Sequence, residues 1–222
     1  MVTNRRGAGR SGGCGRSLVA IRNVAGGDAR TGAIVVGAHG YSPLQRWMLG
    51  SVSRGVVRRA TAAVLVAKDR RPAPRHFVIG YDGSSNARRA VAFVAKLTVP
   101  RNGRVTVLGL SEPFHPPATA FMPSSLRAAL TSEVRSVNAQ RLARTQRQLE
   151  ASGRSLEASG WRVRAEARHG IAVRDLGRVA AALGGNLLVV GARGASGLRR
   201  ILLGSTAEAV LDRASMPVLV VR

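Results

Sequence analysis

The chain has 222 residues, 45% of them hydrophobic, which is enough to bury one core of roughly 100 to 200 residues and part of a second. No apolar run approaches the roughly 18 residues of a membrane-spanning helix, and the basic amino terminus lacks the apolar segment of a secretion signal. We therefore expect a cytoplasmic protein without a membrane partner. The single cysteine, Cys14, excludes an internal disulfide and has no metal-ligating residues near it.

The formal net charge is +24, and 33 of the 35 basic residues are arginine. Summed basic charge attracts phosphate backbones, so association with nucleic acid is one alternative function. The excess is spread evenly between residues 1–75 and 76–222, however, and aromatic residues make up only 4% of the chain, which leaves few stacking platforms for bases. The charge pattern favours a solvated, arginine-rich surface.

The first third of the chain predicts less than half a domain. Residues 1–16 read as a disordered leader rich in arginine and glycine. Residues 69–75, with two prolines, read as a linker, and His76, which directly follows them, is given no role beyond that of a linker residue. Between them, residues 17–68 predict a helix over 18–25, a strand over 33–36, a glycine loop, a helix around 53–59 and a strand over 63–67.

Residues 76–222 predict a complete domain. Short apolar strands alternate with helices in the order βαβαβαβαβ, and the longest helix is expected over Ser124–Ala158 with Leu142, Leu149 and Leu156 on one side. Such alternation is typical of parallel strands with right-handed crossovers and helices on both faces. The fold class is therefore α/β, a doubly wound five-stranded parallel sheet preceded by a partial copy of the same domain.

A repeat connects the two regions. At a constant offset of 154, residues 35–68 and 189–222 are identical at 17 of 34 positions. The shared residues include the pairs Gly37/Gly191, Gly40/Gly194, Gly50/Gly204 and Ser51/Ser205. Because the period has the size of a domain, we interpret the chain as a tandem pair whose first member has lost its front.

The second repeat predicts a phosphate site. In a sheet ordered 3-2-1-4-5, ligands bind between strands 1 and 4, which brings Asp82 next to Gly191. Gly191 and Gly194 let the backbone approach a ligand closely, and a helix that opens with Gly204, Ser205 and Thr206 offers N–H groups to phosphate oxygens. Arg193 adds positive charge.

Structural explanations exist for the same residues. Ser205 and Glu208 have the spacing of a capping box, and Asp82 could serve a turn or a helix cap. Neither of the common glycine-rich phosphate motifs is present. We expect no catalytic residue and no metal site, because the loops offer no general base beside the phosphates and no carboxylate cluster beyond Asp82.

The spacing G-x2-G-x9-G-S, which both repeats contain, resembles that of the universal stress protein family. The stretch "FVIGYDGSSNARRAVAFVA" resembles the family's opening strand and helix, and "ASMPVLVVR" resembles its closing strand. The resemblance covers residues 76–222 as a whole domain and 18–67 in part.

The resemblance implies a flavodoxin-like, or adenine nucleotide alpha hydrolase-like, domain that binds ATP, with or without Mg2+, in a regulatory stress response. It implies that Asp82 and the backbone of Leu110 serve the adenine and ribose. By the same resemblance the phosphates are held by Gly191, Arg193, Gly194, Gly204, Ser205 and Thr206. Weak ATPase activity is the alternative.

The resemblance also implies pairing through last strands, either between the two repeats of one chain or in a homodimer. Within the chain, we expect residues 64–66 to dock against residues 218–220. The first repeat lacks the strand that would supply an aspartate, so its own nucleotide site should be incomplete.

Overall fold

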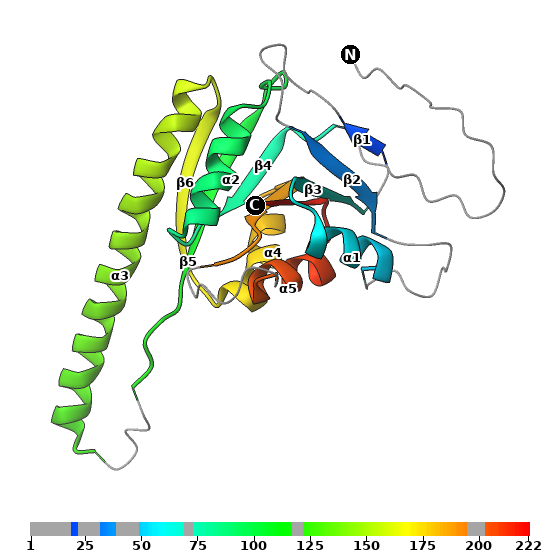
Figure 1. Ribbon diagram of the computed structural model, residues 1–222. Coiled ribbons are helices and arrows are strands. Elements are labelled where there is room, and N and C mark those ends of the chain that lie inside the picture. Colours follow the sequence, from blue (N-terminus) through cyan, green and yellow to red (C-terminus); the bar gives the residue numbers. More distant parts are fainter. Residues whose placement is uncertain (1–18, 22–31, 39–48, 69–72, 117–121, 195–202) are drawn as a thin grey trace, which may run out of the picture.

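The computed structural model describes residues 19–21, 32–38, 49–68, 73–116, 122–194 and 203–222. Within these residues, eight strands form a single sheet in the order β1-β2-β3-β8-β7-β4-β5-β6 (Figure 1). The strands are β1 (Val19–Ile21), β2 (Ala33–Gly37), β3 (Ala63–Ala67), β4 (His76–Gly80), β5 (Arg104–Ser111), β6 (Arg162–His169), β7 (Leu187–Gly191) and β8 (Val218–Val221). The helices are α1 (Ser51–Arg59), α2 (Ser85–Ala95), α3 (Ser124–Ala158), α4 (Ala172–Ala182) and α5 (Ser205–Arg213).

The strands that follow residue 75 form a parallel α/β unit. They lie in the order β6-β5-β4-β7-β8, and every neighbouring pair is parallel. Numbered along the chain from β4, this is the order 3-2-1-4-5. One helix separates each strand from the next, as crossover connections between parallel strands require.

Helices cover both faces of this unit, so its central strands are buried on both sides (Figure 1). In β4, Val78 packs on the face that holds α4 and α5, whereas Phe77 and Ile79 pack on the opposite face with α2 and α3. The alternation follows from the two-residue period of a strand. The result is a three-layer arrangement with an apolar core on each face of the sheet.

Helix α3 has the bounds that the sequence predicts, and it reaches well beyond the sheet (Figure 1). Leu149 and Leu156, from its carboxyl-terminal half, are fully buried, whereas Leu142 is half-buried. Only the last part of the helix therefore contributes to the core, and most of residues 124–148 are exposed.

The region before residue 69 differs from expectation at its start. Val19–Ile21 form a strand that pairs antiparallel with β2, so the helix expected over 18–25 is wrong at these residues. β-branched Val19 and Ile21 suit an extended chain, and the pairing satisfies an edge of β2 that would otherwise present open N–H and C=O groups. Residues 22–25, the predicted leader 1–16 and residues 69–72 of the predicted linker lie outside the described residues.

The repeat in sequence is also a repeat in structure. Strands β2 and β3 pair in parallel with Gly37 opposite Ala67, and β7 and β8 pair with Gly191 opposite Val221, which is the same register. Helices α1 and α5 each have nine residues and follow an N-cap glycine, Gly50 or Gly204. We call β2, α1 and β3 the first repeat, and β7, α5 and β8 the second repeat.

The two repeats join through an antiparallel pairing of β3 with β8. Leu65 lies opposite Leu219, and Val64 and Val66 lie opposite Val220 and Val218. This confirms the predicted docking of residues 64–66 on residues 218–220. Because Leu65 and Leu219 are themselves equivalent at the offset of 154, a local two-fold axis passes between them. The core continues across this seam, since valines of both strands belong to one buried cluster.

His76 is the second difference from expectation, because it does not belong to the linker. It begins β4 and is only 6% exposed. Its Nδ1 lies 3.0 Å from the carbonyl oxygen of Gly184, and its Nε2 lies 2.8 Å from the hydroxyl of Thr106. A neutral ring fits both partners by donating to the carbonyl and accepting from the hydroxyl. Burial, aided by the charge of Arg104, lowers the pKa of His76 despite the opposing hydrogen bond to Gly184.

The lowered pKa of His76 predicts a pH-dependent stability. Between the pKa of His76 in the folded chain and its unfolded value of 6.5, the unfolded chain binds more protons than the folded chain. The contribution of His76 to the free energy of unfolding is therefore fully present above pH 6.5 and is lost as the pH falls toward the folded pKa. In urea titrations from pH 7.5 to 5, we expect the free energy of unfolding to fall for the natural chain and to fall less for His76→Gln. Parallel pH profiles for the two proteins would contradict this role.

Candidate functional site

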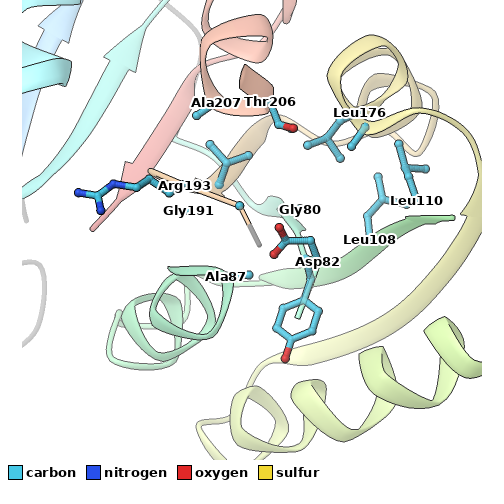
Figure 2. Close-up of a pocket in the computed structure, with 14 residues that line it drawn as sticks. Gly80, Asp82, Ala87, Leu108, Leu110, Leu176, Gly191, Arg193, Thr206 and Ala207 are labelled. Carbon is cyan, nitrogen blue, oxygen red and sulfur yellow. The ribbon is translucent and has the colours of Figure 1, made fainter. Parts of the chain in front are cut away.

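A crevice opens at the carboxyl ends of β4 and β7, where the order of the parallel strands reverses (Figure 2). It lies beside the first turns of α2, α4 and α5. Six of the eight residues predicted for the nucleotide site line it: Asp82, Leu110, Gly191, Arg193, Gly194 and Thr206. The topology therefore brings together residues that lie more than 100 positions apart in the sequence.

One wall of the crevice is apolar. Leu108 and Leu110 come from the carboxyl end of β5, Leu176 comes from the second turn of α4, and Val190 comes from β7. Of these four residues, only Leu110 was predicted from the sequence as part of the site. The others could have been found, because the residues at the ends of neighbouring parallel strands, and in the helix after the third strand, face the same switch point.

Asp82 follows β4, and its carboxylate points into the crevice (Figure 2). Its Oδ1 accepts a hydrogen bond of 3.0 Å from the backbone N–H of Ser84, so Asp82 does hold a turn. It is not the helix cap, because the Ser84 hydroxyl caps α2 by accepting from the N–H of Ala87 at 3.1 Å. The second carboxylate oxygen, Oδ2, lies against Gly194, where an added Cβ would be 2.9 Å away.

The glycines of the loop have packing roles. A Cβ at Gly191 would lie 2.7 Å from the backbone carbon of Asn86 and 3.0 Å from the backbone nitrogen of Ala87, at the start of α2. A Cβ at Gly204 would lie 3.1 Å from Cα of Arg193. Close approach of backbone segments therefore explains these two glycines without a ligand.

Replacement of Gly191 should expose this constraint. We expect Gly191→Ala to lower the free energy of unfolding by about 1–3 kcal/mol, because the new methyl group meets backbone that cannot move aside cheaply. The control is Gly55→Ala in α1, where an added Cβ has no atom within 4 Å and should stabilise the helix by up to about 1 kcal/mol. Urea titration measures both, and a neutral Gly191→Ala would show that α2 adapts.

Helix α5 begins without a side-chain cap. Its N-cap is Gly204, so Ser205 is already the first helical residue, and the alternative explanation of Ser205 and Glu208 as a capping box does not hold. A capping hydroxyl must come from the N-cap position, which glycine occupies. Glu208 instead forms an ion pair with Arg58, and Ser205 is exposed. The first turn of α5 presents Thr206 and Ala207 to the crevice.

Arg193 lines the crevice, but its guanidinium points away from Asp82 and Gly191 (Figure 2). Burial lowers the pKa of Arg222, and the charge of Arg193 lowers it further. The Arg193 charge therefore acts on the region of β8 in this structure, and it would have to swing inward to meet an anion in the crevice.

The enclosed volume of the crevice is about 80 Å3. Typical small-molecule sites enclose roughly 300–1,000 Å3. A whole nucleotide would therefore extend past the mouth of the crevice or widen it on binding. Among the described residues, no group of three or more His, Cys, Asp or Glu side chains could hold a metal ion. The helices of the described regions include none that is both long and apolar enough to cross a membrane.

Comparison with protein families identifies a match over most of the chain. The model of the Universal stress protein family matches residues 31–68 and 74–222. Universal stress proteins of Mycobacterium tuberculosis and Mycobacterium bovis are 31% identical to this chain over 199 residues, in a match that covers 85% of this chain and 61% of theirs. The chain thus spans about three fifths of the length of these curated relatives.

Solved structures share the fold. A universal stress protein from Archaeoglobus fulgidus superposes with a TM-score of 0.52 at 22% identity, covering 86% of this chain and 60% of its own. The hypothetical protein MJ0577, whose biochemical function was assigned from its structure, has a TM-score of 0.56 at 21% identity and covers 66% of this chain and 94% of its own. At these identities the likeness concerns the fold alone.

Proposed function

Because this chain belongs to the universal stress protein family, we propose that its crevice binds an adenine nucleotide, ATP in the first instance, and that binding regulates a stress response in the cytoplasm. The observation that carries the proposal is the meeting of Asp82, the glycine loop and the uncapped first turn of α5 at one crevice. Asp82 and the glycines each have a structural explanation by themselves, in a turn and in close backbone packing. Their convergence at the switch point of a parallel sheet supports a ligand.

The adenosine part suits the inner end of the crevice. Leu108, Leu110 and Leu176 form an apolar wall against which a flat base can pack, and the carboxylate of Asp82 can accept hydrogen bonds from ribose hydroxyls. Because the enclosed space is small, the phosphates would lie outside it, beside the first turn of α5. Backbone N–H groups there, with the hydroxyls of Ser205 and Thr206, are suitable donors to phosphate oxygens.

We propose binding rather than catalysis. In the described part of the crevice, Asp82 is the only carboxylate and no histidine is present, so a positioned base for phosphoryl transfer is lacking. If Mg2+ accompanies the nucleotide, phosphate oxygens and water would supply most of its ligands, because Asp82, the only carboxylate in the described part of the crevice, is assigned to the ribose. Slow hydrolysis of bound ATP would be a side reaction of this site.

We propose one nucleotide site in the described part of the chain. Next to the second repeat, β4 pairs with β7 in parallel and leads into Asp82. Next to the first repeat, β1 occupies the equivalent position and pairs with β2 in the antiparallel direction. The first repeat is thus interpreted as a partial domain without an aspartate of this kind. Its role would be to complete the sheet and not to hold a ligand.

Replacement of the aspartate tests the ribose assignment. We expect Asp82→Ala to weaken ATP binding about tenfold or more, through the loss of a charged hydrogen-bond acceptor, and to leave the chain folded. Glu157→Ala, which removes an equal charge from an exposed position near the end of α3, is the matched control and should bind as the natural chain does. Calorimetric titration with ATP measures affinity and the number of sites, while circular dichroism checks the fold. Unchanged affinity in a folded Asp82→Ala protein would remove Asp82 from the site.

The repeat provides a matched control for the phosphate side. Gly204→Glu should abolish ATP binding, because the new carboxylate would stand beside the phosphate position and repel it. Gly50→Glu makes the same change at the equivalent N-cap of α1, where an added Cβ meets only the Ala38 carbonyl oxygen at 3.6 Å, and should leave ATP affinity unchanged. Because a Cβ at Gly204 would lie 3.1 Å from Cα of Arg193, Gly204→Ala controls for the steric effect, and a loss of ATP affinity as large as that of Gly204→Glu would show that packing, and not charge beside the phosphates, is affected.

A further inference from the structure

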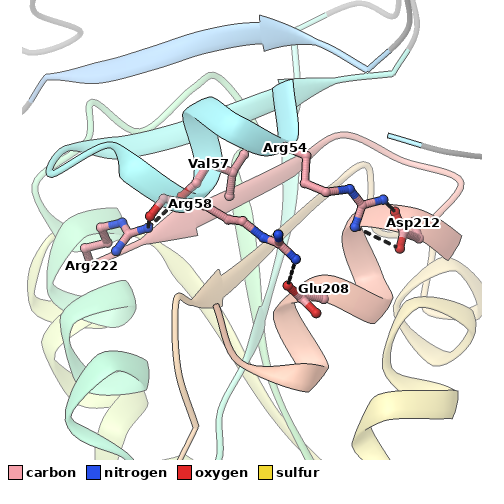
Figure 3. Close-up of polar contacts among 6 residues, drawn as sticks. All are labelled: Arg54, Val57, Arg58, Glu208, Asp212 and Arg222. Carbon is pink, nitrogen blue, oxygen red and sulfur yellow. Dashed lines mark hydrogen bonds and ion pairs between the residues drawn. The ribbon is translucent and has the colours of Figure 1, made fainter. Parts of the chain in front are cut away.

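Helices α1 and α5 face each other across the seam between β3 and β8, joined by two ion pairs (Figure 3). Nη2 of Arg54 lies 2.7 Å from Oδ1 of Asp212, and Nη2 of Arg58 lies 2.8 Å from Oε1 of Glu208. These four side chains connect the first repeat with the second one turn apart along each helix.

The four residues occupy two equivalent positions of the repeat. At the offset of 154, Arg54 corresponds to Glu208 and Arg58 corresponds to Asp212. The local two-fold axis therefore converts one ion pair into the other. The positions are the same in both repeats and the charges are opposite, with two arginines on α1 and two acids on α5.

Other contacts at the seam do not distinguish the repeats. Lys68 and Arg222 are equivalent cations, and each reaches the end of the opposite helix: Nζ of Lys68 lies 2.7 Å from the carbonyl oxygen of Ala214, and Nη2 of Arg222 lies 2.6 Å from that of Val57. Cations at a helix carboxyl end are favourable in either repeat. The strand register, with valine opposite valine, is also one that two identical repeats could form.

We propose that the charges on α1 and α5 make this seam selective for two unlike repeats, so that β8 pairs with β3 of the same chain and not with β8 of a second chain. Pairing of two β8 strands around the same axis would set Glu208 of one chain against Asp212 of the other, twice. Pairing of two β3 strands would set Arg54 against Arg58. Opposite charges in the right places favour one partner, and like charges exclude the other.

The exposure of the pairs sets the size of the effect. Side chains of the Arg54–Asp212 pair are 26% and 32% exposed, and those of the Arg58–Glu208 pair are 46% and 36% exposed. Each pair alone is therefore weak. Selection depends on the difference between two attractive and two repulsive contacts, which we expect to change the ratio of the two pairings on the order of tenfold or more. This inference does not depend on nucleotide binding.

The test uses full-length chains of identical composition and net charge. R54E/E208R exchanges the charges at one equivalent position, so both contacts within the chain become repulsive while two β8 strands become complementary. R54E/D212R exchanges the members of one ion pair and keeps both contacts within the chain attractive. R54E/R58E/E208R/D212R reverses the signs of both ion pairs and keeps both contacts within the chain attractive. Two chains paired through β8 would then bring only positive charges of their α5 helices together, so this pairing stays repulsive.

Sedimentation velocity over a range of concentrations gives the oligomeric state, and hydrogen exchange at residues 64–66 reports whether β3 is still paired. We expect monomers with protected β3 for the natural chain, R54E/D212R and the fourfold variant, and a concentration-dependent dimer with faster exchange in β3 for R54E/E208R. A natural chain that dimerises through β8, or an R54E/E208R protein that stays monomeric, with or without protection of β3, would overturn the proposal. Increasing salt should diminish the difference between the variants, because the pairs are partly exposed.

Discussion

The antiparallel pairing of β3 with β8 is the contact on which the remaining structure depends. Without it, the described residues before 69 comprise three short strands and one nine-residue helix, which we expect to bury too little apolar surface to remain folded alone. With it, Val57, Val64 and Val66 enter the same core as Val218 and Val220. The pairing also covers an edge of the parallel sheet that would otherwise invite contacts with other chains.

The crevice depends on a second constraint, the parallel arrangement of β4 and β7. Parallel strands end on the same side of a sheet, so the turn after β4 and the loop after β7 must meet. Their close contact requires glycine at position 191, because α2 begins directly beside it. Gly191 and Gly194, which pack closely against α2 and Asp82, also line the crevice. Packing and a bound ligand would therefore both favour glycine at these positions, and neither purpose can be deduced from the glycines alone.

Hydrophobic patterning predicted the strands and helices after residue 75 well, because helices cover both faces of that sheet and its apolar residues are buried in one of two cores. The β3–β8 seam was predicted from the family resemblance, which implies pairing through last strands, and not from hydrophobic patterning. Patterning failed for β1, which is too short to carry a periodicity and is stabilised by its partner strand. It failed for His76, whose burial depends on Thr106 and Gly184, which are distant in sequence. The capping box failed because an S-x-x-E spacing does not reveal which residue occupies the N-cap.

The seam also imposes a delay during synthesis. About 150 residues separate β3 from β8, and a ribosome adds roughly 5–20 residues per second, so β3 waits on the order of ten seconds for its partner strand. During that interval its edge can template pairing with the same segment of a neighbouring nascent chain on one messenger RNA. Arg54 of one chain would then face Arg58 of the other, and their mutual repulsion would keep translating chains apart until the acids of α5 have been made.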